Sequence, residues 1–178
     1  MTISGRDNRS LRAVPLPTFY EVFRAQLRTL IAADCDSLDL FSLSRVLDRA
    51  GASELARTTC LQAIARGLPE AIEPHALWHL AAQHKRERSY DAAVEAWIKI
   101  SSLESRYMVQ ACEELAIHYE HRVRDANKAL EFAEAAWLHL QNASGSHAWL
   151  ERLAHRRERL LRKAQKKCVD GSQPRLSC

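Results

Sequence analysis

Histidine and glutamate residues occur at helical spacings that could place metal ligands on one face. His75 and His79 are four residues apart, and Glu114, His118 and His121 follow one another at spacings of four and three. Imidazole and carboxylate groups arranged in this way can bind zinc. The first pair has no evident third ligand, and a histidine near a helix interface usually forms an ordinary hydrogen bond or lies on the surface. We therefore predict no metal site.

The five cysteines do not indicate a disulfide framework or a zinc knuckle. They are odd in number, widely spaced and without a CxxC pair, and Cys60 and Cys112 fall among apolar residues, where a small buried side chain fits. The chain also contains no glycine-rich phosphate loop, no GxSxG and no recognisable catalytic triad. It has no apolar N-terminal run and no stretch long enough to span a bilayer. We expect a cytoplasmic protein without a cofactor and without a membrane partner.

A run of basic residues near the C-terminal end could bind an anionic surface. From Arg152 to Lys167 the chain carries eight basic residues and one acidic residue, whereas the whole chain has a net charge of only +4, so the rest is net acidic. A basic helix face fits a phosphate backbone or an acidic protein. It fits equally well the solvated outer face of a last helix. The candidate nucleic-acid-binding residues are Arg156, Arg157, Arg159, Arg162, Lys163, Lys166 and Lys167.

The elements that carry these residues follow a repeated pattern of two amphipathic helices. In the clearest copy, about residues 74–104, apolar residues recur at helical spacing, a polar break follows, and a second apolar stripe begins. Similar copies occupy about residues 38–67 and 108–140, the last with an extra residue in its break. Ala56, Ala93 and Ala129 are equivalent, which gives a period of about 36 residues. Small residues at these positions allow two helices to approach closely.

This pattern resembles tetratricopeptide repeats, whose period is about 34 residues. The composition agrees, because 47% hydrophobic residues can form a core while five glycines and five prolines leave little material for β-turns. The predicted fold is therefore all-α: a tetratricopeptide-like array of helical hairpins, or α-solenoid, closed by a basic C-terminal capping helix.

Capping residues predict where the helices begin and end. Thr18 and Glu21 form a capping box before a helix expected from about Phe19 to Ala33. Asp36 or Ser37 is expected to cap the next helix, and the last helix covers about residues 147–167. We predict one helical-repeat domain at residues 15–168, a flexible lead-in at 1–14 and a disordered tail at 169–178.

Two segments resemble bacterial ribonuclease-H-like exonucleases of the YprB type. Residues 17–24 together with 36–43 are similar to the strand-to-helix end of the nuclease fold, and Glu114–Glu134 is similar to the helical-repeat region that commonly follows it. The resemblance implies two metal ions held by four carboxylates, of which Asp39 alone has a match. One ligand cannot build a two-metal site. The resemblance therefore implies the repeat half without the nuclease part, no catalytic residue, and an Asp39 that favours the helix dipole.

If the first helix of each pair lines the inner face, as in tetratricopeptide proteins, the residues of these helices that do not belong to the apolar packing stripes would form a groove. Its cations could bind the carboxylates of an extended acidic peptide while an aromatic residue anchors a side chain. Phe41 and Ile117 belong to the same face, but we expect Phe41 in the core, and Trp78 fits either place. The predicted groove residues are Arg45, Arg49, Trp78, Lys85, Arg86, Glu113 and His121.

Two functions remain compatible with the sequence. The first is a non-catalytic interaction or scaffold module that binds a protein partner, as the accessory repeat region of an exonuclease would. The alternative is a nucleic-acid-binding accessory that acts through the basic last helix. The oligomeric state stays open.

Overall fold

The computed structural model describes residues 35–142 and 147–171, with side chains as far as Lys166. The chain divides into two units, Met1–Cys35 and Asp36–Cys178, and the second is described here. The predicted lead-in and the predicted helix Phe19–Ala33 lie outside the described residues.

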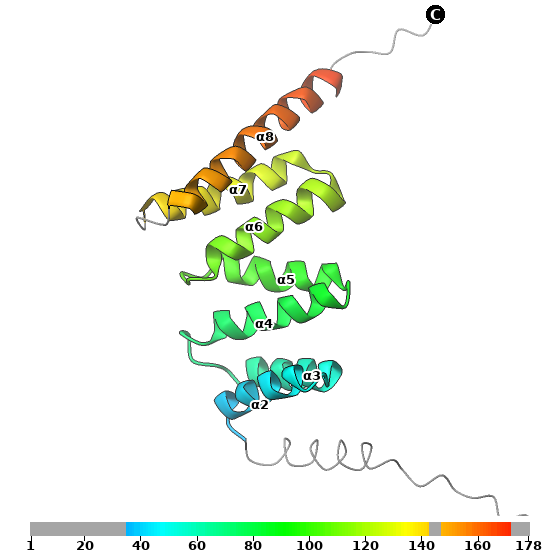
Figure 1. The fold of residues 1–178 in the computed structure, drawn as a ribbon, viewed down its shortest axis with the longest axis vertical. Coiled ribbons are helices and arrows are strands. Elements are labelled where there is room, and N and C mark those ends of the chain that lie inside the picture. The colour runs from blue at the N-terminus through cyan, green and yellow to red at the C-terminus, as the bar shows by residue number, and fades with distance from the viewer. Residues whose placement is uncertain (1–34, 143–146, 172–178) are drawn as a thin grey trace, which may run out of the picture. The chain divides into compact units, whose positions relative to one another are not determined.

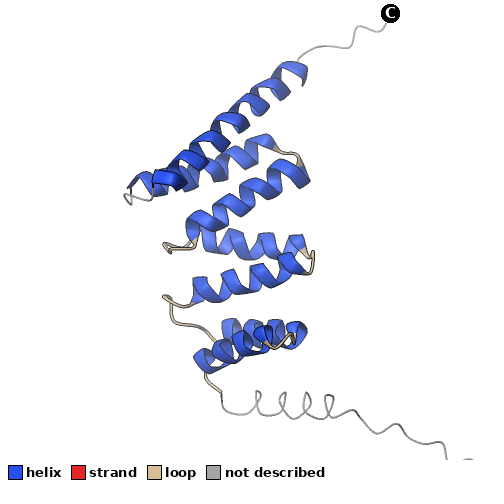
Figure 2. Cartoon of the chain, in the orientation of Figure 1, coloured by secondary structure: helices blue, strands red, loops and turns tan. Residues whose placement is uncertain are grey.

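The described residues form helices joined by short loops, with no β-strand among them (Figures 1 and 2). Each helix packs mainly against its neighbours in the chain, so that α2 pairs with α3, α4 with α5, and α6 with α7. The elements are α2 (Ser37–Arg49), α3 (Ser53–Ala65), α4 (Glu73–Arg86), α5 (Tyr90–Ser101), α6 (Met108–His118), the π-helical turn η1 (Tyr119–Val123), α7 (Ala126–Asn142) and α8 (His147–Gly171). The described part is thus all-α, as predicted.

The helix ends follow from local sequence. Asp36 is the N-cap of α2, and its carboxylate accepts a hydrogen bond of 2.8 Å from the backbone N–H of Asp39. Gly51 and Gly67 follow α2 and α3 in the left-handed region, with φ of 79° and 82°, which suits glycine best. Pro74 lies in the first turn of α4, where its missing N–H costs nothing.

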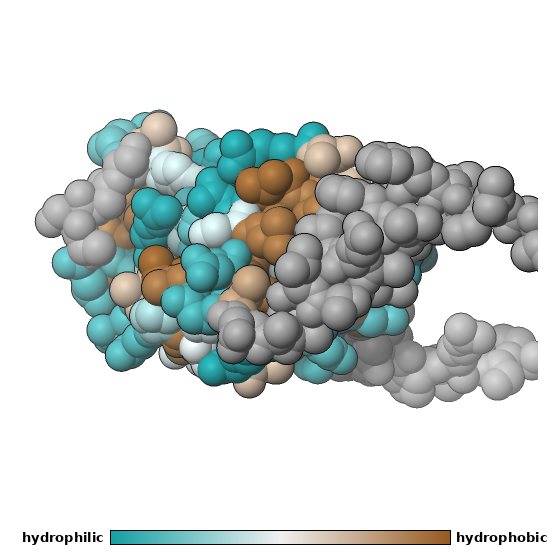
Figure 3. Space-filling view, turned by 90° about the horizontal axis from the view of Figure 1, so that it is seen from below, coloured by the Kyte–Doolittle hydropathy of each residue, from teal (hydrophilic) through white to brown (hydrophobic). Residues whose placement is uncertain are grey.

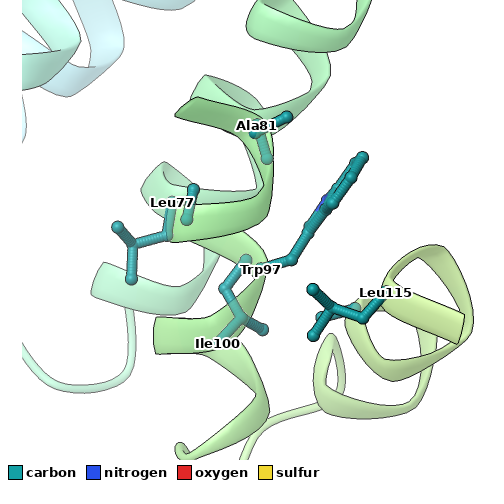
Figure 4. Packing of buried hydrophobic residues seen from close by; sticks show 8 residues of the cluster. Leu77, Ala81, Trp97, Ile100 and Leu115 are labelled. Carbon is teal, nitrogen blue, oxygen red and sulfur yellow. The ribbon is translucent and has the colours of Figure 1, made fainter. Parts of the chain in front are cut away.

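The core lies between successive helices. Ala56, Ala93 and Ala129, predicted to lie at close crossings, are completely buried. Figure 4 shows Trp97 and Ile100 of α5 lying between α4 and Leu115 of α6. The alternation of alanine with large side chains lets the helices approach and still fill the space between them.

The connection between α6 and α7 differs from the prediction. The extra residue of the third copy was expected in the polar break between its helices, but the chain stays helical to Val123, and Arg124 makes the turn with φ of 59°. A π-helical turn accommodates an inserted residue, which explains how the extra residue of the third copy fits. Asp125 then accepts hydrogen bonds of 3.1 and 3.2 Å from the backbone N–H groups of Asn127 and Lys128, and so caps α7.

The last helix extends further than the sequence predicted. Helix α8 continues to Gly171, so Val169–Gly171, assigned to the tail from sequence, are helical.

Seen from the α2 end, hydrophobic atoms lie among hydrophilic ones (Figure 3). Leu38 and Val46 of α2 and Leu61 of α3 are exposed. Among the described helices, none has the length and apolar character needed to cross a bilayer.

Candidate functional site

A hollow of about 450 Å³ opens between α4, α5 and α6. It combines an apolar lining with charged groups, and we call it the central hollow. Two indole rings and one alanine provide the apolar part, and two cations and one carboxylate provide the rest. Its lining residues are Trp78, Ala82, Lys85, Arg86, Trp97 and Glu114.

Each cation of the central hollow pairs with a carboxylate of a neighbouring repeat. Lys85 Nζ lies 2.7 Å from both carboxylate oxygens of Glu114 on α6. On the other side, Arg86 donates a hydrogen bond of 2.5 Å to Asp48 on α2. The Lys85 and Arg86 side chains are still 48% and 56% exposed. Both cations can therefore meet a ligand from solution.

The two tryptophans of the hollow have different roles. Trp97 is 3% exposed and belongs to the core between α4 and α6. Trp78 is half-buried, and its ring stacks on Tyr107 with 5.9 Å between centroids. Trp78 was left open between core and groove by the sequence, and in the structure it both packs on the core and lines the hollow.

A second hollow of about 120 Å³ shares three lining residues with the first, namely Lys85, Trp97 and Glu114. We call it the side hollow. Arg122 lies over the Tyr90 ring there, 3.2 Å from its centroid. The side hollow is completed by Tyr90, Ile117, His118 and Arg122.

The other predicted groove residues do not gather at the central hollow. Arg45 and Arg49 are exposed on α2, and neither forms an ion pair with another described residue. Phe41 is buried, as expected, with its ring 5.1 Å from that of His75. Glu113 pairs at 2.8 Å with Arg152 of α8. The structure thus brings together Trp78, Lys85 and Arg86 and leaves the rest apart.

The basic face of α8 meets a buried carboxylate. Glu120 of η1 is 7% exposed. Arg159 donates two hydrogen bonds to it, at 3.0 and 2.7 Å, and Lys163 donates a third at 2.6 Å. Arg156 approaches it at 3.4 Å, and His121 lies 3.6 Å away. Burial raises the pKa of Glu120, but the hydrogen bonds and positive charges of Arg159 and Lys163 outweigh burial and lower that pKa from 4.5 to about 2.

Most of the predicted phosphate-binding residues are therefore already paired. Arg157 bonds to Glu134 of α7 at 3.1 Å, and Arg162 lies 4.0 Å from Glu158 on its own helix. Lys166 is exposed, and the side chain of Lys167 lies outside the described part. These ion pairs link α8 to α6, η1 and α7, while the side chains of Arg159 and Lys163 remain 46% and 49% exposed.

The histidines at metal-ligand spacing have other contacts. The His75 ring stacks on Tyr107 at 5.5 Å, and His79 Nε2 lies 3.3 Å from the Gln83 amide nitrogen and 3.8 Å from Asp48. Burial lowers the pKa of both histidines. Within residues 35–142 and 147–171, no three potential ligands gather around a possible metal position.

Sequence reasoning missed three residues of these sites. Glu114 was considered only as a metal ligand, and Trp97 only as part of a helix stripe. Glu120 was not considered. A signal for it existed, because Arg152, Arg156, Arg159 and Lys163 are spaced at four, three and four residues, which places them on one helix face. Leu153 and Leu160, on the adjoining side of the helix, are completely buried.

Comparisons with known proteins support the fold. No protein-family model matches the chain, and no curated protein does. Among solved structures, the chain is similar to the crystal structure of MamA, a tetratricopeptide-like helical protein, with a TM-score of 0.50 and 16% sequence identity. The match covers 85% of this chain and 91% of MamA. The chain is thus a tetratricopeptide-like helical solenoid, which confirms the predicted fold class.

Proposed function

We propose that this chain is a non-catalytic interaction module that binds an acidic segment of a protein partner at the central hollow. One observation carries the proposal: Lys85 and Arg86, both about half exposed, flank an apolar hollow formed by Trp78, Ala82 and Trp97. An indole in a hollow is a common anchor for one partner side chain, and neighbouring cations bind carboxylates.

The charge around the hollow favours an acidic partner over a basic one. Arg45 and Arg49 do not line the hollow, but they add two exposed cations on α2, the first helix of the preceding repeat. Positive potential of this kind speeds association with an acidic segment and disfavours a basic one. The selectivity should therefore follow the sign of the partner's charge.

The test uses two fluorescein-labelled peptides of equal length. One alternates glutamate with small residues around a single phenylalanine, and the other has lysine in place of glutamate. Fluorescence anisotropy should show binding of the acidic peptide only. Trp78→Ala should weaken binding about fivefold or more, as expected for an aromatic anchor. Arg86→Gln should weaken it as well, whereas Lys99→Gln, an equal charge change on exposed α5 surface, should not. Equal binding of both peptides, or of neither, contradicts the proposal.

A relation to the accessory repeat region of YprB-type exonucleases is the finer part of the proposal. What supports it is the residue pattern of Glu114–Glu134, which spans the end of α6, η1 and the start of α7. The coding sequence upstream of Met1 can test it. Carboxylate motifs of a ribonuclease-H-like fold there would support the relation, and an unrelated neighbour would remove its basis.

The proposal also includes the lack of nuclease activity. Asp39 lies exposed in the first turn of α2, where a carboxylate favours the helix dipole. The purified chain with magnesium or manganese should therefore leave DNA and RNA intact. Metal-dependent cleavage that is lost in Asp39→Asn would overturn this part of the proposal.

A further inference from the structure

The Lys85–Glu114 ion pair lies at the boundary of the two hollows. Both hollows are lined by Lys85, Trp97 and Glu114, and no other residue is common to their linings. The Lys85 ammonium is 2.7 Å from both Glu114 oxygens and 5.9 Å from the centre of the Trp97 ring. The pair therefore bridges α4 and α6 directly above the buried indole.

This ion pair occupies the groups that an acidic ligand would use. Glu114 binds Lys85 with both oxygens, as a partner's carboxylate would. The two side chains are 48% and 23% exposed, so the pair is partly solvated. Ion pairs in such positions contribute little to stability, and one carboxylate can replace another at small cost. Arg86 is held by Asp48 in a similar way.

Because Lys85 and Arg86 each already have a carboxylate, their charge selects an acidic ligand over a basic one but adds little to its affinity. Additional binding affinity must come from contact with the apolar lining of Trp78, Ala82 and Trp97. The volume of about 450 Å³ is ample for one aromatic or branched aliphatic side chain. Selectivity would then need both features in the same segment: an apolar side chain beside a carboxylate.

We propose that an acidic partner segment displaces Glu114 from Lys85 and places an adjacent aromatic or branched aliphatic side chain in the central hollow. Glu114 is thus a built-in competitor that sets the affinity of the site. This inference rests on the proposed function, and it adds the ligand pattern and the residue that limits binding.

The first experiment compares Glu114→Gln with Glu134→Gln. Both variants lose one negative charge, and Glu134 pairs with Arg157 away from both hollows. Removing the competitor should tighten binding of the acidic phenylalanine peptide about twofold to fivefold, the equivalent of one partly exposed ion pair. Glu134→Gln should change the affinity by much less. An unchanged or weaker affinity in Glu114→Gln, or an equal gain in both variants, overturns the inference.

The second experiment tests the apolar part. An acidic peptide with alanine in place of phenylalanine should bind more weakly to the unchanged protein. The difference between the two peptides should disappear in Trp78→Ala, because the side chain would have lost its contact. If the difference persists in Trp78→Ala, the phenylalanine binds elsewhere and the ligand pattern is wrong.

A measurement without any ligand separates this inference from the proposed function. Acetylation of lysines by a mild reagent, followed by mass spectrometry, reports the reactivity of Lys85 relative to exposed Lys99. The ratio should rise in Glu114→Gln and stay constant in Glu134→Gln. A rise without any peptide binding would contradict the proposed function alone. No rise would show that Glu114 does not restrain Lys85 and would overturn the displacement step.

Discussion

At the residue scale, alanine at the helix crossings determines how closely the helices approach. Ala93 is completely buried and belongs to the cluster that contains Trp97 and Leu115. Replacing it with leucine should overpack this crossing and lower the free energy of unfolding by about 1–3 kcal/mol. Thermal denaturation followed by circular dichroism measures the effect. Ala65→Leu, at an exposed position near the end of α3, is the control and should change little. Equal stability of both variants would contradict the assigned repeat pattern.

The half-buried His75 makes stability depend on pH. The pKa of His75 is lowered from 6.5 mainly by burial and further by Arg45 and Arg106. Below pH 6.5 the unfolded chain therefore binds more protons than the folded chain, so the free energy of unfolding decreases as the pH falls. We expect a lower melting temperature at about pH 5.5 than at about pH 7.5. His75→Phe keeps a ring against Tyr107 but cannot be protonated, so its melting temperature should depend less on pH. An identical pH dependence would exclude His75 as a cause.

At the element scale, α8 is attached by two different kinds of contact. Leu153 and Leu160 are completely buried, and cations of the same helix pair with Glu113 and Glu120. Removing the charge of Glu120 leaves three cations without their shared partner and costs about 1–3 kcal/mol. Because the cations that contact Glu120 all lie on α8, the loss of stability should appear first as local release of α8 from the array.

Two buried cysteines can report that release. Cys112 packs against Leu153 of α8, whereas Cys60 donates a hydrogen bond to the Ala76 carbonyl of α4, far from α8 in the sequence. Burial raises the pKa of both thiols to about 11, so both should react slowly with a thiol reagent. In Glu120→Gln, Cys112 should react faster while Cys60 stays slow. Glu158→Gln, an exposed change on α8, is the control. If both cysteines become faster together, the whole array has loosened and α8 is not separately released.

The helices could be predicted more completely than their contacts. The N-cap at Asp36 and the buried alanines at 56, 93 and 129 follow from local sequence, since capping and helical periodicity act within a few residues. The partner of Lys85 could not be predicted in this way. Lys85 and Glu114 are 29 residues apart, and their contact depends on how one helix pair rotates against the next. The π-helical turn could not be predicted for a related reason, because the sequence alone does not show whether an extra residue lies in a loop or within a helix.

At the scale of the whole molecule, the repeat period predicted the solenoid but not the distribution of its charge. The basic run of α8 accounts for the net positive charge of the chain, yet several of its cations are bound by acids of the preceding repeat. Intramolecular pairing of this kind offsets part of the charge of a basic segment that looks like an anionic-surface binder in the sequence alone. The central hollow has fewer cations but combines them with an apolar lining, and it is then the better candidate site.

This pairing leads to a quantitative prediction for nucleic acid. If all seven candidate residues contacted phosphates, the slope of log K against log salt would be about −6, at about −0.9 per contact. With Arg156, Arg157, Arg159 and Lys163 held by Glu113, Glu120 and Glu134, the remaining Arg162, Lys166 and Lys167 leave about three contacts and a slope no steeper than about −3. Titration of a labelled generic DNA duplex over a range of salt concentrations measures the slope. Changing Arg162, Lys166 and Lys167 together to glutamine should abolish any binding seen at low salt without altering the circular dichroism spectrum. A slope near −6 would mean that the ion pairs of α8 open to receive phosphates, and nucleic-acid binding through α8 would then replace the central hollow as the leading function.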